Sequence, residues 1–328
     1  MTLISIVVPT HNELQNIGPL HERIKAVFQQ MPEYDFELLF SDDSTDETPK
    51  RIVALREIDP RVKLVRLSRR FDQSVAIAAG IDHCTGAAAI LMDADLQDPP
   101  EALPEMLRLW AAGNEVVYAQ RESASNYRLY KFYAKLYYRL LRKLASVDIP
   151  LGAGEFRVLD RKVLDFLRQI KEHSRYMRGL TVWPGLRQAC VKIDRPQRQA
   201  GQTNYNFRKS LLNAVDGIVS FSVVPLRWAM MAGVGIAAMS ILAGFACAVI
   251  KLEGWIDFSV GWTSLIVSMF FLGGVQLIVL GIVGEYIGRI FLEVQNRPVY
   301  WIDFTLGFDD EVKRSTALAH GPGPVRTE

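Results

Sequence analysis

The amino-acid sequence predicts an α/β domain with a mostly parallel sheet, followed by interfacial helices and two C-terminal transmembrane helices. Three observations predict this fold class. Short runs rich in branched residues alternate with amphipathic helical patterns from the start to about residue 120. Polar clusters directly follow four of these runs. Two later stretches, 228–250 and 262–283, are apolar and almost free of charge.

The composition limits the functional classes. A chain of 328 residues can form one large or two ordinary domains. Its net charge of +2 gives no electrostatic reason to expect nucleic-acid binding, so we expect none. Three widely spaced cysteines form no CxxC or Cys/His cluster, which indicates free thiols in a reducing compartment. Residues 3–8 lack the basic segment and cleavage site of a signal peptide and are expected to form a strand.

Strands and helices alternate regularly in the N-terminal part of the chain. This order implies right-handed crossovers and a sheet covered on both faces. The expected strands are residues 4–8, 36–40, 62–67, 88–92 and 115–119, with a further one within 186–193. The expected helices are residues 13–28, 46–56, 72–83 and 100–112.

Polar clusters at the ends of the strands form the candidate site. They are Pro9–Glu13, Ser41–Asp46, Asp93–Asp95 and Tyr118–Arg121. Helix capping explains any one of them, and Ser44-x-x-Glu47 fits a capping box. Four such clusters at one sheet edge are harder to explain by caps. Open parallel α/β sheets bind their ligands at this carboxyl edge.

The acidic cluster lies in Ile90-Leu-Met-Asp-Ala-Asp-Leu-Gln-Asp-Pro-Pro-Glu101. In a strand, Asp93 and Asp95 would project from the same face. Adjacent carboxylates repel each other unless a cation lies between them, and Mg²⁺ or Mn²⁺ with a substrate phosphate suits them. The alternative is a helix N-terminus that favours acidic residues. No glycine-rich phosphate loop follows any strand, so a bound diphosphate would be held by a metal and basic side chains such as Arg121.

The segment after residue 125 has a different character. Residues 126–145 interleave tyrosines with lysines and arginines, which predicts an interfacial helix in the membrane headgroup layer; an ordinary amphipathic helix packed on the sheet is the alternative. Glu155, beside two glycines, could reach the site or cap a turn. Residues 195–205 could form a lid that carries Arg198 toward a phosphate, or a surface connector.

The C-terminal part is expected to anchor the chain in a membrane. Residues 206–227 read as a juxtamembrane amphipathic helix, and 228–290 as two transmembrane helices, since each apolar run has roughly the 20 residues that a span needs. The alternative of two buried core helices fits poorly, because the runs are too long and too uncharged. Residues 291–328 are expected to form a cytoplasmic tail, disordered from about residue 315.

The charges that flank the spans predict the orientation. Lys209 and Arg227 precede the first span, and Arg289 and Arg297 follow the second. The connector between the spans has one lysine against two acids. The positive-inside rule therefore places the α/β domain and both termini in the cytoplasm, in a multi-pass protein of the inner membrane.

Several of these motifs resemble those of glycosyltransferase family 2. They are Pro9-Thr-His-Asn-Glu13, Asp42-Asp43, Asp93-Ala-Asp-Leu-Gln-Asp-Pro-Pro-Glu101 and Gly284-Glu-Tyr-Ile-Gly-Arg289. The subgroup that looks closest is the bacterial polyprenyl-phosphate glycosyltransferases, relatives of dolichyl-phosphate mannose synthase. The resemblance covers about residues 3–302 and implies a GT-A domain at 1–205. It also implies inverting, metal-dependent transfer of one sugar from a nucleotide-sugar to a polyprenyl phosphate such as undecaprenyl phosphate.

The resemblance implies roles for individual residues. Those expected at the nucleotide are Pro9, Asn12, Glu13, Asp42, Asp43 and Asp93. Those expected at Mg²⁺ or Mn²⁺ are Asp95 and Gln97, with Asp93 nearby. Those expected at the reacting groups are Asp95, Arg121 on the donor phosphate, Lys131 on the acceptor phosphate, Arg198 on the mobile loop and Glu155 on the acidic loop.

Departures from the family pattern leave the donor open. Ser-Asp-Asp-Ser replaces the usual Asp-Asp-Gly-Ser, so either Asp42 or Asp43 could meet the base. Arg70-Phe71-Asp72 replaces an Asn-Phe/Tyr-Gly run, and Lys131 stands where relatives carry Arg. UDP-glucose or a similar UDP-sugar is the expected donor, as the commonest in the subgroup.

The alternative functions are a GDP-mannose-dependent mannose synthase, a processive polysaccharide synthase and a non-catalytic membrane nucleotide-binding protein. The second usually carries Gln-x-x-Arg-Trp, whereas Arg227-Trp228 follows Val224-Pro-Leu here. The third would not need a metal cluster, a basic acceptor face and a lid together. Besides donor, acceptor lipid and bilayer, candidate partners are a second copy of the chain and a downstream flippase for the lipid-linked sugar.

Overall fold

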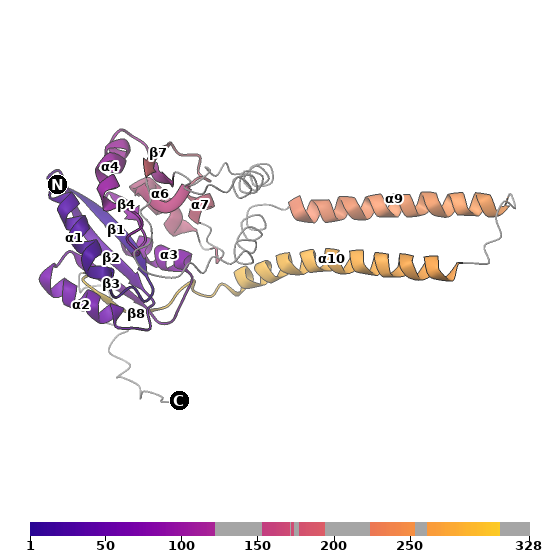
Figure 1. The fold of residues 1–328 in the computed structure, drawn as a ribbon, viewed down its shortest axis with the longest axis horizontal. Coiled ribbons are helices and arrows are strands. Elements are labelled where there is room, and N and C mark those ends of the chain that lie inside the picture. Colours follow the sequence, from indigo (N-terminus) through magenta and orange to yellow (C-terminus); the bar gives the residue numbers. More distant parts are fainter. Residues whose placement is uncertain (122–152, 171, 174–176, 194–223, 253–260, 309–328) are drawn as a thin grey trace, which may run out of the picture. The chain divides into compact units, whose positions relative to one another are not determined.

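A computed structural model describes residues 1–121, 153–170, 172–173, 177–193, 224–252 and 261–308 (Figure 1). The predicted interfacial helix at 126–145, the lid, most of the juxtamembrane helix and the tail beyond 308 therefore lie outside the described residues. The chain divides into two compact units. The α/β unit comprises 1–142, 147–206 and 298–328, and the second unit comprises 143–146 and 207–297.

The α/β unit is built on one eight-stranded sheet in the order β7-β5-β6-β4-β1-β2-β3-β8. The strands are β1 (Thr2–Thr10), β2 (Tyr34–Asp42), β3 (Val62–Leu67), β4 (Ala88–Leu91), β5 (Val116–Arg121), β6 (Ala153–Asp160), β7 (Gln188–Ile193) and β8 (Ile302–Leu306). Four of the seven pairings among these described strands are parallel: β1 with β2 and β4, β2 with β3, and β5 with β7. β6 runs antiparallel between β4 and β5, and β8 runs antiparallel to β3. The predicted mostly parallel α/β sheet is confirmed.

The four predicted helices are present in the described residues, and two further helices follow β6 in the α/β unit. They are α1 (Ile17–Phe28), α2 (Thr48–Ile58), α3 (Gln73–His83), η1 (Pro100–Ala102), α4 (Leu103–Ala111), α6 (Arg161–Gln169) and α7 (Met177–Leu180). Both α1 and α2 begin later than their patterns suggest, because the preceding residues belong to loops at the carboxyl edge of the sheet. These loops contain most of the candidate site.

The core explains why the central strands are almost purely apolar. Ile6, Val7 and Val8 are all completely buried, so both faces of β1 are covered, as in parallel sheets between helices. α3 lies very close to β1 at Gly80, where an added Cβ would be 2.3 Å from Val7 Cγ1. A glycine is therefore required where the C-terminal half of α3 crosses β1.

Two details of the sheet differ from the prediction. The strand expected at 88–92 ends at Leu91, so Asp93 and Asp95 lie in the following loop and do not project from a strand face. The sequence reading also missed β8, which lies in the segment predicted as tail. Its alternation of Ile302, Phe304 and Leu306 is a weak signal over only five residues.

The second unit contains two long helices, α9 (Val224–Leu252) and α10 (Trp262–Gln295), which pack against each other. Among the described residues, one helical segment is long and apolar enough to cross a membrane, Ser268–Gln295 within α10. The apolar segment described within α9 is shorter, Leu226–Leu242. α10 is followed by Asn296, whose left-handed φ of 46° is typical of a helix C-terminus.

Candidate functional site

A cavity of about 320 Å³ opens at the carboxyl edge of the sheet, over β1, β2, β3 and β4. The loops after these four strands and the first turns of α3 line it. The structure therefore brings three of the four predicted polar clusters together. The lining residues are Pro9, Thr10, His11, Glu13, Asp43, Arg70, Phe71, Asp72, Gln73, Ala76, Asp93, Ala94 and Asp95.

Asp42 and Asp43 have different roles in this arrangement. Asp42 is completely buried, and its carboxylate accepts hydrogen bonds from Thr10 Oγ1 at 2.9 Å and from Ser44 Oγ at 2.5 Å. It also forms an ion pair with the guanidinium of Arg66 on β3. Asp42 therefore holds the ends of β1, β2 and β3 together beneath the cavity and does not line it.

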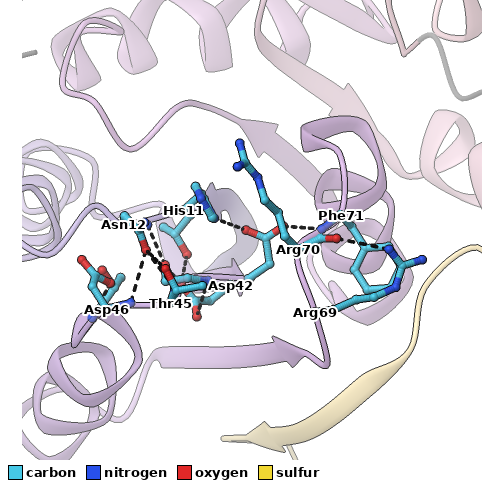
Figure 2. Close-up of polar contacts among 12 residues, drawn as sticks. His11, Asn12, Asp42, Thr45, Asp46, Arg69, Arg70 and Phe71 are labelled. Atoms are coloured by element: carbon cyan, nitrogen blue, oxygen red, sulfur yellow. Dashed lines mark hydrogen bonds and ion pairs between the residues drawn. The ribbon is translucent and has the colours of Figure 1, made fainter. Parts of the chain in front are cut away.

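Asp43, the next residue, lines the cavity. Its Oδ1 lies 2.8 Å from Nδ1 of His11, and its Oδ2 accepts a hydrogen bond from the backbone N–H of Phe71 at 2.7 Å (Figure 2). A single carboxylate thus joins the loops after β1, β2 and β3. Of the two aspartates, Asp43 is the one placed to meet a ligand.

Asn12 connects the first two loops. Its backbone has a left-handed φ of 59°, which Asn tolerates better than most residues. Its Oδ1 accepts hydrogen bonds from the backbone N–H groups of Thr45 at 2.8 Å and Asp46 at 3.3 Å (Figure 2). Its own N–H donates to Ser44 Oγ at 2.8 Å. The structure thus gives Asn12 a positioning contact, and its expected contact with a nucleoside stays a prediction.

The loop after β3 supplies a basic side chain that the sequence reading singled out only as a departure from the family pattern. Arg70 lines the cavity beside Phe71 and Asp72. The guanidinium of the preceding Arg69 lies 4.2 Å from the centroid of the Phe71 ring, which braces the loop (Figure 2). The signal that could have identified Arg70 is a cation at the carboxyl end of a predicted strand.

Asp93 and Asp95 face the same cavity from the loop after β4. Oδ1 of Asp93 accepts a hydrogen bond from Nε2 of Gln73 at 2.6 Å. Oδ1 of Asp95 accepts one from the backbone N–H of Gln97 at 3.1 Å. Leu96, between Asp95 and Gln97, has a left-handed φ of 60°, an uncommon conformation for a residue with a bulky side chain. Gln97 is not among the lining residues, so its side-chain contact with a metal stays a prediction.

A divalent cation fits the chemistry of this lining. Among the described residues, no three His, Cys, Asp or Glu side chains are grouped closely enough to hold a metal ion by themselves. Asp93 and Asp95 offer carboxylate oxygens at one wall of the cavity, and hard cations such as Mg²⁺ and Mn²⁺ prefer oxygen ligands. Mg²⁺ is usually bound by one or two carboxylates together with substrate phosphates. Two carboxylates are therefore sufficient if a substrate brings phosphate oxygens.

The remaining predicted residues are not part of the described lining of the cavity. Oε1 of Glu155 on β6 accepts a hydrogen bond from Nε of Arg178 at 2.7 Å, and Glu155 does not line the cavity. β5 ends at Arg121, whose side chain lies outside the described part of the structure. Lys131 and Arg198 also lie outside it, so the expected phosphate contacts of these three residues stay predictions.

Comparison with known proteins gives consistent matches. Residues 5–168 match the family model described as glycosyl transferase family 2. The chain is 41% identical to an uncharacterized glycosyltransferase, YkcC, of Bacillus subtilis, over 94% of this chain and 95% of that one. It is 38% identical to the SfII prophage-derived bactoprenol glucosyl transferase of Shigella flexneri, over 91% and 97%. The crystal structure of glucosyl-3-phosphoglycerate synthase from Mycobacterium tuberculosis is 17% identical, with a TM-score of 0.42 over 66% of this chain and 77% of that one.

Proposed function

Because the chain belongs to glycosyl transferase family 2, we propose that it transfers a single sugar from a nucleotide-sugar to a polyprenyl phosphate at the cytoplasmic face of a membrane. The observation that carries this proposal is the cavity whose wall contains both Asp93 and Asp95. Its support is the set of relatives named bactoprenol glucosyl transferase, which match this chain over more than nine-tenths of its length. The α/β unit would then be a GT-A domain.

The donor would lie along the carboxyl edge of the sheet. The nucleoside would occupy the part of the cavity lined by Pro9, Glu13 and Asp43, and the diphosphate the part lined by Asp93 and Asp95. Bound Mg²⁺ or Mn²⁺ would neutralise charge that develops on the leaving diphosphate. UDP-glucose or a similar UDP-sugar is the proposed donor, and GDP-mannose is the runner-up.

The reaction would be a direct displacement at the anomeric carbon. An oxygen of the lipid phosphate forms the new bond to this carbon, and the bond from the carbon to the nucleoside diphosphate breaks, with inversion. The phosphate is already anionic at neutral pH, so no strong general base is required. His11 is the one histidine in the described lining of the cavity, and its Nδ1 contacts Asp43.

Two phosphate-bearing substrates would repel each other as they approach. Arg121, Lys131 and Arg198 are the proposed cations that screen this repulsion, as preorganised charges do in other transferases. Arg70 is a further cation on the described wall of the cavity. Glu155 would complete the acceptor side of the site, held in place by Arg178.

The acceptor explains why a sugar transferase would need a membrane anchor. A polyprenyl tail lies in the bilayer, so the enzyme must work at its surface. α10 contains the one described segment with the length and hydropathy of a span. We propose that α9 provides the second span, which would return the chain to the cytoplasmic side.

A product analysis tests the proposed function. The purified chain is incubated with Mg²⁺ or Mn²⁺, undecaprenyl phosphate and, in separate reactions, UDP-glucose, other UDP-sugars or GDP-mannose. Mass spectrometry should show one sugar on the lipid phosphate, with UDP-glucose the best donor. The Asp95→Asn variant should insert into membranes normally but lose turnover, whereas Asp165→Asn, which changes an exposed acid on α6, should not.

The other outcomes identify the alternatives. A mannosyl lipid formed from GDP-mannose alone would reveal a mannose synthase, and a polymeric product would reveal a processive synthase. Nucleotide binding without turnover by any donor would indicate a non-catalytic nucleotide-binding protein. Near-normal turnover by Asp95→Asn would refute the metal site.

A further inference from the structure

A short segment near the C-terminus, residues 300–308, belongs to the α/β unit although α9 and α10 separate it from the rest of that unit in the sequence. We call it the C-terminal segment. It contains β8, which pairs antiparallel with β3 from Leu67↔Ile302 to Leu64↔Leu306. Next to this ladder, the backbone N–H of Ser68 donates a hydrogen bond to the carbonyl oxygen of Trp301 at 3.0 Å.

The same segment also contacts the last turn of α3. Tyr300 donates a hydrogen bond from its hydroxyl to Oδ2 of Asp82 at 2.7 Å. The Phe308 ring lies edge-on to the His83 ring, with 5.5 Å between centroids, and the Nζ of Lys63 lies 5.1 Å from the Phe308 centroid. The C-terminal segment is thus attached to both β3 and α3, the strand and helix that follow each other in one βα unit.

The connection between β3 and α3 forms a wall of the cavity. It runs from Ser68 to Asp72 and contributes Arg70, Phe71 and Asp72 to the lining. The first residue of α3, Gln73, holds Asp93. Ser68, the first residue of this connection, is the one bonded to Trp301. A movement of β3 or α3 would therefore displace the residues that line the cavity.

The segment has one contact with the hydrophobic core, through Leu306, and exposes two of its aromatic side chains. Trp301 is 60% exposed and Phe304 is 38% exposed. Its other contacts are a backbone ladder, one hydrogen bond from Ser68, two side-chain contacts with α3 and the contact of Lys63 with Phe308. Contacts of this kind order the groups they join, and ordering a wall before a ligand arrives lowers the conformational entropy lost on binding.

We infer that the C-terminal segment is a positioning element of the cavity, which holds the wall formed by residues 68–72 in its ligand-binding conformation. It is not a catalytic element, since none of its residues lines the cavity. The inference rests on the proposed function only for the identity of the ligand, a nucleotide-sugar. The part of the chain that follows the membrane helices would thereby contribute to donor affinity.

Two substitutions in the full-length chain test this role. Tyr300→Phe removes only the hydroxyl that bonds Asp82. Gly307→Val strains the end of the segment, because Gly307 has a φ of 93° and an added Cβ would meet Arg56. Tyr34→Phe, which removes a hydroxyl from β2, is the matched control. Hydrogen exchange of the amides at 68–72 and the steady-state constants for donor and acceptor are measured for each.

The expected result is faster exchange at residues 68–72 in Tyr300→Phe and more so in Gly307→Val, with no change in Tyr34→Phe. The KM for the nucleotide-sugar should rise about three- to tenfold, the effect of one lost hydrogen bond on an equilibrium. The kcat and the KM for undecaprenyl phosphate should stay within about twofold, which a general loss of folded protein would not produce.

Other outcomes overturn the inference. Unchanged exchange at residues 68–72 would mean that the segment does not hold the wall. Faster exchange with an unchanged KM for the nucleotide-sugar would mean that donor binding does not depend on the ordering of the wall by the C-terminal segment. If the wild-type chain turns over no nucleotide-sugar, the proposed function fails, and the exchange comparison still decides whether the segment orders the cavity wall.

Discussion

Nε2 of Gln73 donates a hydrogen bond to Oδ1 of Asp93 at 2.6 Å and so joins the start of α3 to the acidic loop after β4. The hydrogen-bond donor is the neutral amide of Gln73, so it orients the Asp93 carboxylate without cancelling its charge. This hydrogen bond therefore orients Asp93 at the wall of the cavity that it shares with Asp95. Residues that orient a metal ligand in this way influence metal affinity strongly.

A charge placed at Gln73 should disturb the metal site. Gln73→Glu would bring a second carboxylate against Asp93, and the two would repel each other. The Mg²⁺ or Mn²⁺ concentration for half-maximal transfer should rise about tenfold or more, as for other residues that support a metal ligand. Gln169→Glu, the same change at the end of α6, should have no effect. An unchanged metal requirement in Gln73→Glu would show that Asp93 does not contact the metal.

Substitution of Asp42 should mainly lower stability, whereas substitution of Asp43 should mainly weaken donor binding. Asp42→Ala removes the carboxylate partner of the largely buried Arg66, which keeps only its hydrogen bond to the Ser44 carbonyl, and should lower the free energy of local unfolding around β2 by about 3 kcal/mol. Asp43→Asn keeps an acceptor oxygen and should lower this free energy of unfolding by about 1 kcal/mol while raising the KM for the nucleotide-sugar.

Hydrogen exchange of the β2 amides measures the first effect, because the two-unit chain is not expected to unfold in a single step. Steady-state kinetics with varied nucleotide-sugar measures the second. Equal losses of stability in both variants, with equal donor KM values, would contradict the division of roles.

The buried Glu37 should make the α/β unit sensitive to acid. Burial alone would raise the pKa of Glu37, but hydrogen bonds from Lys63, Ser5 and Thr85 outweigh it and hold this pKa below its ordinary value of 4.5. The stability that Glu37 contributes is therefore present above pH 4.5 and is lost as the pH falls through the lower pKa of the folded state.

Removing the charge of Lys63 should raise the pH at which this acid transition occurs. In Lys63→Met the burial of Glu37 is less compensated, so its pKa should rise and acid unfolding should begin at a higher pH. Circular dichroism followed from pH 7 to pH 2 measures the midpoint. Lys50→Met, which breaks an exposed pair with Glu47, is the control and should leave the midpoint in place. A shift of the same size in both variants would rule out Glu37 as the group responsible.

Thiol labelling should reveal the topology. A cysteine introduced at Glu253, between the two proposed spans, should react with a membrane-impermeant reagent in intact cells, because the connector is expected outside. Cys190 is exposed on the α/β unit and should react only after permeabilisation. Cys84 should stay silent, since burial raises the pKa of its thiol to about 11. Labelling of Cys190 in intact cells would contradict a cytoplasmic catalytic unit.

Local patterns were enough to predict the elements that form the frame of the site. The first five strands and the helices between them were identified because short runs rich in branched residues alternate with amphipathic helical patterns. β8 was missed because it is a short edge strand, stabilised by pairing with β3 across more than 200 residues of sequence. A five-residue alternation has no comparable local signal.

For the candidate site too, some features could be predicted from the sequence and others could not. The sequence by itself determined which residue types gather at the carboxyl ends of the strands, because strand direction and alternation place them there. Only the tertiary structure decided that Asp43 meets the cavity while Asp42 lies beneath it, that Asp93 is held by Gln73, and that residues 300–308 support the cavity wall. These relationships depend on contacts between loops and on an edge pairing, which arise only when distant parts of the chain pack together.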